Sequence, residues 1–485
     1  MNILKSLKLN AFLNGLRSLL SVLFPLITFP YVSRVLSVTG IGKYNFSNSV
    51  VSYFMLIAAL GISNYAVREG AKYRDNTRRI DQFANEIFTI NVCSALVAYI
   101  CLFISLIIFT RLHSYLTCIL IYSIQIGFSV ISVDWLFTIY EDFVYITIRS
   151  ILFQVLSIAL LFIFVRHPND YLNYAAITVF SAVGSNVLNF YKAEKEHKIR
   201  LVFHFNWKQH MIPIMILFAA NVANLIYVNS DITLLGLLKN DYIVGIYSIS
   251  SRIYSIIKNV LSAMLLVSVP RLALLYGNKK ITEYKALLLK LTNVLVLFTL
   301  PAMIGLIMLS KQVVLIIAGN HFIRSVMSLR ILAIAYIFSI LAWVLSDCVL
   351  IPAKREKYLL YSMITSAVIN IVFNLVMIRY WSENAAAIST VLSELIMFII
   401  NYHYSKDIIQ KVFISKQLLN TFVNSLIGCI GIVVVCLVVS SMISSLIIKT
   451  ILSVLSSVLV YGLILILLRN PYVVGLLKQY AKKLK

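Results

Sequence analysis

Apolar stretches recur along the whole chain and are separated by short polar segments. A helix needs about 20 mostly apolar residues to cross the hydrocarbon core of a membrane. The pattern predicts 14 such spans, numbered here in chain order, which begin near residues 9, 44, 87, 115, 146, 171, 211, 242, 287, 326, 358, 384, 417 and 448. The predicted fold class is therefore an all-α integral membrane protein with about 14 transmembrane helices.

Two adjacent predicted spans, 7 and 8, carry polar side chains inside their apolar runs. In span 8 these positions recur at steps of three and four residues, which places them on one helix face. They are Ser248, Arg252, Ser255, Asn259 and Ser262. Span 7 carries Asn221, Asn224 and Asp231 on one face, and Lys258 adds a second charge to span 8. A charge at membrane depth costs roughly 3 kcal/mol or more, so these faces are expected to line a hydrophilic cavity.

Spans 1 and 2 carry similar polar positions. Span 1 has an in-phase stripe that includes Arg17, and Arg34 follows at its outer end. Span 2 has Asn48 in its first turns. The candidate substrate-binding residues are Arg17, Arg34, Arg252, Lys258, Asn48 and Asn259. Two alternatives stay open: Arg17 reaches the cytoplasmic headgroups, and Arg34 anchors its helix at the interface.

Four acidic residues are candidates for ion coupling or gating. Asp231 either carries a coupling cation or proton, or forms an ion pair with Arg252 or Lys258 on span 8. Asp134 and Asp347 lie at predicted helix ends, where capping or gate closure is expected. Glu394 lies deep in span 12 and is either a proton or cation site or a protonated, hydrogen-bonded core acid.

Weak internal similarity indicates a repeat. Residues 41–48 align with residues 244–251 at an offset of 203, and Asp134 with Tyr145 corresponds to Asp347 with Tyr358 at an offset of 213. Spans 1 to 6 and 7 to 12 are therefore predicted to be two six-helix lobes, related by a pseudo-two-fold axis along the membrane normal. The predicted lobes cover residues 1–195 and 196–410, and residues 411–485 add a peripheral helix pair and a basic tail.

Charge and composition narrow the class further. Hydrophobic residues make up 61% of the chain, and the mean hydropathy is +0.92. The net charge of +24 is unevenly placed: 29 of the 42 lysines and arginines fall on the side of the N-terminus and 10 on the other. This asymmetry predicts that both termini are cytoplasmic, and it excludes nucleic acid as the reason for the charge. The six cysteines and seven histidines lack metal-binding spacing, so no metal or other cofactor is expected beyond a coupling cation or proton.

Several motifs resemble the polysaccharide flippases of the multidrug/oligosaccharidyl-lipid/polysaccharide (MOP) superfamily. Residues 30–42 are similar to the family's signature after its first helix, and residues 68–72 to the end of its second. Residues 134–149 resemble its connection between the fourth and fifth helices, and residues 351–357 the matching loop of the second half. The chain departs from the family at Ser37 and Ile139, where glycine is usual.

The resemblance implies a non-enzymatic flippase in the bacterial plasma membrane. Such a protein moves a polyprenyl-diphosphate-linked oligosaccharide repeat unit from the inner to the outer leaflet by alternating access, driven by an ion gradient or the membrane potential. Fixed cations suit a diphosphate, because arginine presents donors in a geometry that fits phosphate. The expected partners are the lipid-linked oligosaccharide, membrane lipids and polysaccharide polymerase machinery.

Two other functions fit the sequence less well. An ion-coupled multidrug or cation exporter of the same superfamily would favour an acidic cavity, whereas the polar stripes of spans 1, 7 and 8 are net positive. A membrane polysaccharide polymerase or acyltransferase would need a sizeable outer loop with catalytic groups, and the predicted outer loops are mostly short. The chain has no phosphate-binding glycine loop, so direct use of ATP is not expected.

Overall fold

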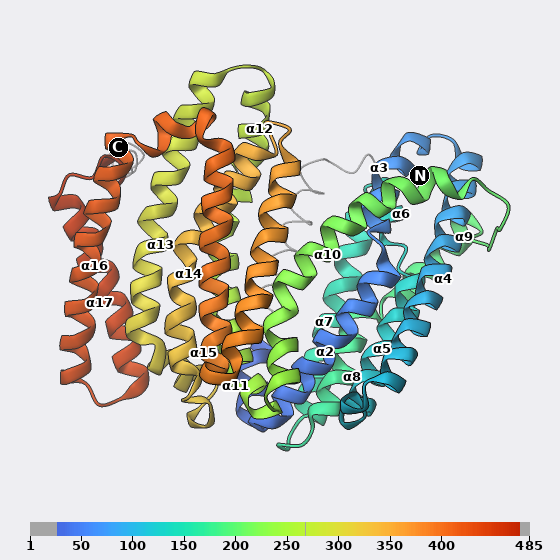
Figure 1. The fold of residues 1–485 in the computed structure, drawn as a ribbon, viewed down its shortest axis with the longest axis horizontal. Helices are drawn as coiled ribbons and strands as arrows, with labels where there is room; N and C mark the ends of the chain where they lie inside the picture. Colours follow the sequence, from blue (N-terminus) through green and yellow to red (C-terminus); the bar gives the residue numbers. More distant parts are fainter. Residues whose placement is uncertain (1–26, 267, 476–485) are drawn as a thin grey trace. The chain divides into compact units, whose positions relative to one another are not determined.

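The structure, a computed structural model, describes residues 27–266 and 268–475 (Figure 1). In these ranges every regular element is a helix and none is a strand. The helices of the first half are α2 (Val38–Ala59), α3 (Ile62–Gly70), α4 (Thr77–Ile108), α5 (Leu116–Val130), α6 (Asp134–Ile139), α7 (Phe143–Phe164), α8 (Tyr171–Val183), α9 (Asn186–His197) and α10 (Trp207–Leu238). Those of the second half are α11 (Asp241–Leu266), α12 (Val269–Gly277), α13 (Ile281–Ile317), α14 (Ser325–Leu345), α15 (Glu356–Phe413), α16 (Lys416–Met442) and α17 (Leu446–Leu467).

The predicted all-helical membrane fold is confirmed. Within the described residues, 10 helices are long and apolar enough to cross a membrane. Each predicted span from the second onward falls on a described helix, and most of span 1 lies outside the described residues. Spans 11 and 12 are the two parts of α15, which are separated by non-helical backbone at Ser382 (φ 48°).

The contacts divide the chain into two compact units, which meet at Gly245 and Ile246. The first unit contains α2 to α10 and the start of α11, and the second contains the rest. This division follows contacts, whereas the predicted lobes of residues 1–195 and 196–410 follow a sequence repeat. The lobe layout therefore stays a prediction.

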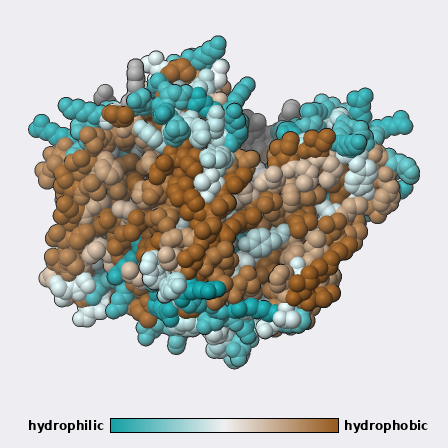
Figure 2. All heavy atoms as spheres, in the orientation of Figure 1, coloured by the Kyte–Doolittle hydropathy of each residue, from teal (hydrophilic) through white to brown (hydrophobic). Residues whose placement is uncertain are grey.

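In the first unit, α2 packs against α4, α5 and α10, while α8 packs against α5 and α7. A buried apolar cluster lies where α3, α4 and α6 meet, and Ile80, Phe83, Ile87 and Trp135 are among its members. In the second unit, α14 packs against α13 and α15, and the pair α16 and α17 packs on α13. Figure 2 shows that, on the face in view, each unit carries an apolar band between hydrophilic ends, as expected for helices surrounded by lipid.

Helix α4 begins ten residues before the predicted start of span 3, for two reasons. Asn76 caps the helix by accepting a hydrogen bond from the Arg79 N–H at 3.1 Å. Side chains in the first turns of α4 also form hydrogen bonds with the end of α9, the segment that follows it and the start of α10. The contacts are His197 Nδ1 to Asp81 Oδ1 (2.7 Å), Arg200 N to Asn85 Oδ1 (2.7 Å), Val202 N to Thr89 Oγ1 (2.9 Å) and His210 Nε2 to Glu86 Oε2 (2.9 Å). Hydropathy alone could not predict this polar extension of the helix.

The starts of α2 and α11 cross at two glycines. A Cβ atom added to Gly42 would lie 1.8 Å from the carbonyl oxygen of Asp241, the first residue of α11. A Cβ added to Gly245 would lie 2.1 Å from the carbonyl oxygen of Val38, the first residue of α2. Both glycines are required because only a residue without a side chain allows the backbones to approach so closely. The contact is reciprocal, since Gly245 and Asp241 each follow their counterparts Gly42 and Val38 by 203 residues.

Candidate functional site

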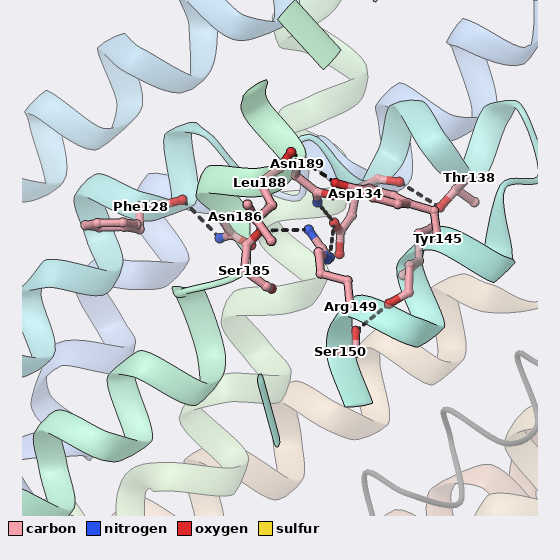
Figure 3. Close-up of polar contacts among 11 residues, drawn as sticks. Phe128, Asp134, Thr138, Tyr145, Arg149, Ser150, Ser185, Asn186, Leu188 and Asn189 are labelled. Atoms are coloured by element: carbon pink, nitrogen blue, oxygen red, sulfur yellow. Dashed lines mark hydrogen bonds and ion pairs between the residues drawn. The ribbon is translucent and has the colours of Figure 1, made fainter. Parts of the chain in front are cut away.

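A polar cluster inside the first unit centres on Arg149 and Asp134 (Figure 3). Arg149, on α7, is 5% exposed, and its guanidinium donates to Asp134 Oδ1 at 2.8 Å and to the Ser185 carbonyl oxygen at 3.1 Å. The side-chain amide of Asn189, on α9, also donates to Asp134. The carboxylate of Asp134 thus joins α6, α7 and α9 at one point.

Local sequence explains how these groups meet. The side chain of Asp142 caps α7 by accepting from the Tyr145 N–H at 3.4 Å, which places Arg149 within the first two turns of the helix. Asp134 is the first residue of α6, where a carboxylate is favoured by the positive end of the helix dipole. The Ser185 carbonyl oxygen, at the start of α9, accepts the Asn189 backbone N–H at 3.3 Å and also faces the guanidinium in Figure 3.

Beside this cluster lies a cavity of about 520 Å³, called here the Arg149 cavity. Its walls come from α2, α3, α4, α5, α6, α7, α8 and α9. The polar residues that line it are Ser63, Asn91, Gln125, Ser129, Ser132, Asp134, Arg149, Ser150, Gln154, Ser181, Ser185 and Asn186. Amides and hydroxyls therefore dominate the wall, and the charged residues among those described are the paired Asp134 and Arg149.

The second unit contains a different charged pair. Lys258, on α11, donates to Glu394 Oε1, on α15, at 2.7 Å. The Tyr254 hydroxyl donates to the same oxygen at 3.4 Å. Glu394 is 3% exposed, whereas the Lys258 side chain is 25% exposed. Lys258 therefore neutralises a buried carboxylate while part of its own side chain stays exposed.

The remaining predicted site residues are more dispersed. Arg252 and Asn259 are exposed on α11, and Asn48 is exposed on α2. Arg34 is exposed on the segment before α2. Arg17 lies outside the described residues. The structure thus brings Lys258 and Glu394 into direct contact. Arg34 and Asn48 belong to the first unit, and Arg252 and Asn259 belong to the second.

The predicted acidic residues have distinct surroundings. Asp231 is buried on α10. Asp347 lies in a π-helical turn (Ser346–Leu350) and accepts a hydrogen bond from the Trp343 indole at 2.5 Å. Asp134 pairs instead with Arg149, although the predicted repeat would make the two aspartates equivalent. The residue 213 positions after Arg149 is Ser362, so the second half has no cation at that place.

Sequence reasoning missed Arg149 and the amides around it as site residues. A charge in the first turn of predicted span 5 was the available signal, because a buried guanidinium in an apolar helix needs a partner. The glutamines Gln125 and Gln154 gave no signal, since an isolated amide in a span more often joins helices than binds a ligand. Among the described residues, no group of three or more His, Cys, Asp or Glu side chains could hold a metal ion.

The fold resembles that of two solved membrane proteins. It is similar to the structure of the lipid II flippase MurJ in an inward closed conformation, with a TM-score of 0.75 and 14% identity over 94% of this chain and 98% of that one. It is also similar to an inward-facing multidrug resistance MATE family transporter of the MOP superfamily, with a TM-score of 0.55 and 13% identity over 81% of this chain and 99% of that one. The chain therefore shares the helical fold of these two proteins.

The family follows from the sequence itself. Residues 7–275, more than half of the chain, match the family described as polysaccharide biosynthesis protein, and the chain belongs to that family. It is also 22% identical over 380 residues to a Shigella dysenteriae protein named "Putative O-antigen transporter", covering 77% of this chain and 94% of that protein. These findings confirm the predicted relationship to proteins of polysaccharide biosynthesis, and the relative and the two solved structures are themselves named as transporters or flippases.

Proposed function

We propose that this protein is a flippase that moves a polyprenyl-diphosphate-linked oligosaccharide from the inner to the outer leaflet of a bacterial plasma membrane by alternating access. The observation that carries the proposal is membership of the polysaccharide biosynthesis protein family together with the MurJ-like fold. The relative named for O-antigen transport supports the same class of substrate. In this proposal both termini are cytoplasmic, and polysaccharide polymerase machinery receives the product.

The diphosphate is held by fixed cations. Arg252 is exposed on α11, and Lys258 lies six residues further along, about 9 Å at 1.5 Å per residue. A charge-assisted hydrogen bond to phosphate is roughly twice as strong as a neutral one. Arg34, with Arg17, would supply further positive charge, while Asn48 and Asn259 offer amides to sugar hydroxyls.

In this proposal the ion pair between Lys258 and Glu394 couples substrate binding to the release of the Glu394 carboxylate. An arriving diphosphate competes with Glu394 for the lysine ammonium, and the released carboxylate then takes a proton or a cation. Asp231 is a second candidate for that ion, and Asp134 and Asp347 are proposed to stabilise closed helix ends. Direct competition is favoured by the partial exposure of Lys258.

Transport by variants tests the cation mechanism. Arg252→Ala or Arg34→Ala is expected to lower flipping of the organism's own lipid-linked oligosaccharide in proteoliposomes about tenfold or more, because a hydrogen bond to a charged group contributes about 1.5–3 kcal/mol. Both variants should fail to restore surface polysaccharide in a deletion strain, with normal protein levels in the membrane.

Lys195→Ala is the matched control, since Lys195 is an exposed cation on α9 and is assigned no role in binding. Arg252→Lys should keep part of the activity, because it retains charge but loses the two-donor geometry. Full complementation by both alanine variants would contradict the cation mechanism. Loss of drug resistance without loss of polysaccharide would instead support a multidrug exporter.

A further inference from the structure

We propose that the Arg149 cavity of the first unit binds the sugar part of the substrate as an uncharged ligand, apart from the cations that hold the diphosphate. The inference rests on the proposed function and adds a second subsite to it. It is carried by the charge balance, the hydrogen-bonding groups and the size of the cavity.

Charge balance separates this cavity from a phosphate site. Arg149 is compensated by Asp134 at 2.8 Å, and Asn189 also donates to that carboxylate. A diphosphate would have to compete with Asp134 for a guanidinium that is 5% exposed, and would then leave the carboxylate without its cation. The paired wall therefore favours a neutral ligand over an anion.

The lining groups match sugar hydroxyls. Each hydroxyl both donates and accepts, as do the amide and hydroxyl side chains that dominate the wall. The side chains of Gln125 and Gln154 are half-buried and line the cavity. Among the described residues, Asn91 Oδ1 and Arg149 Nε are buried in its wall without a hydrogen-bond partner. Buried polar groups are normally hydrogen-bonded, so these two atoms indicate a polar ligand, and the glutamines offer it further amide contacts.

Size and position agree with a saccharide. The cavity volume of about 520 Å³ falls within the range of about 300–1,000 Å³ that is typical of small-molecule sites. It lies beside the ends of α5 and α8 and the start of α6. This end of the unit is predicted to be cytoplasmic from the basic residues 68–79 and 192–200. A sugar that enters from the cytoplasmic leaflet would meet this end of the unit first.

Binding by the full-length protein in lipid nanodiscs tests the inference with two probes. One is the lipid-linked oligosaccharide fraction from the organism's own membranes, and the other is undecaprenyl diphosphate without sugar. The wild-type protein should bind the sugar-bearing probe more tightly. Gln125→Met and Gln154→Met keep side-chain length but remove the amide, and each should weaken binding of the sugar-bearing probe about tenfold while leaving the bare diphosphate unchanged.

The control variant is Gln417→Met, which removes an exposed amide on α16 and should change neither affinity. Unchanged binding of the bare diphosphate also shows that each variant is folded. Equal weakening for both probes, or no weakening for either, would overturn the sugar subsite. Failure of the wild-type protein to bind either probe would instead reject the proposed function, so the two failures are distinguishable.

Discussion

Arg149 shows how single residues decide what the interior of this membrane protein can do. An ionised side chain inside an apolar bundle is retained only with a partner, and Asp134 supplies one across a gap of 15 residues in the sequence. The pair removes net charge from the cavity wall and leaves its amides to set the chemistry. The corresponding position of the second half, Ser362, carries no charge.

Removing one partner tests the pairing. Asp134→Ala is expected to lower the free energy of unfolding by about 3 kcal/mol, because Arg149 stays buried without its carboxylate. The double variant Asp134→Ala with Arg149→Met should recover part of that loss. Thermal unfolding of the purified proteins in detergent measures both. A double variant that is no more stable than the single one would contradict a role for the pair in stability.

At the scale of elements, the contact between α11 and α15 combines stability with an accessible charge. Lys258 compensates Glu394, which is almost fully buried, and the Tyr254 hydroxyl supports the same oxygen. The partial exposure of the lysine leaves its ammonium accessible to a second anion, which the proposed exchange of partners requires.

Variants that remove the charge of Lys258 alone, or of Lys258 and Glu394 together, distinguish a role of the pair in stability from a role in transport. Lys258→Met should lower thermal stability and abolish flipping, because it leaves a buried carboxylate unpaired. Lys258→Met with Glu394→Gln should restore stability and membrane abundance but not flipping, because the ammonium is still missing. Flipping in proteoliposomes and melting in detergent are measured side by side. Recovered flipping in the double variant would show that the pair is purely structural.

For the whole molecule, the closest backbone approach among these contacts is the crossing of α2 with the start of α11, inside the first unit. Gly42 meets Asp241 and Gly245 meets Val38, and the matching positions differ by 203 residues in both cases. The two-lobe layout itself stays a prediction.

An added methyl group tests how closely these helices must approach. Gly42→Ala should lower the free energy of unfolding by about 2 kcal/mol, as overpacking typically costs about 1–3 kcal/mol, because its Cβ would overlap the Asp241 carbonyl. Gly305→Ala is the matched control, since Gly305 lies inside α13 with no atom within 4 Å of the added Cβ. That change should be neutral or slightly stabilising, as alanine favours helix. Equal melting temperatures for the two variants would contradict the tight crossing.

Much of the architecture was predictable because hydropathy acts locally. A run of about 20 apolar residues has to become a helix in lipid, whatever its neighbours are, since backbone groups there need internal partners. The spans from α2 to α17 followed from that rule, as did the family through its local motifs. The early start of α4 did not, because Asp81, Asn85 and Thr89 form a polar face that binds a connector distant in sequence.

The sequence by itself determined the membrane-spanning helices, the family and the residues whose charge is costly in lipid, because each of these depends on the residues within one segment. Only the tertiary structure decided which charges meet. Lys258 pairs with Glu394 and Asp134 with Arg149, across 136 and 15 residues. The polar wall of the Arg149 cavity was likewise visible only in three dimensions, because its amides come from separate helices and form one polar surface only in the folded protein.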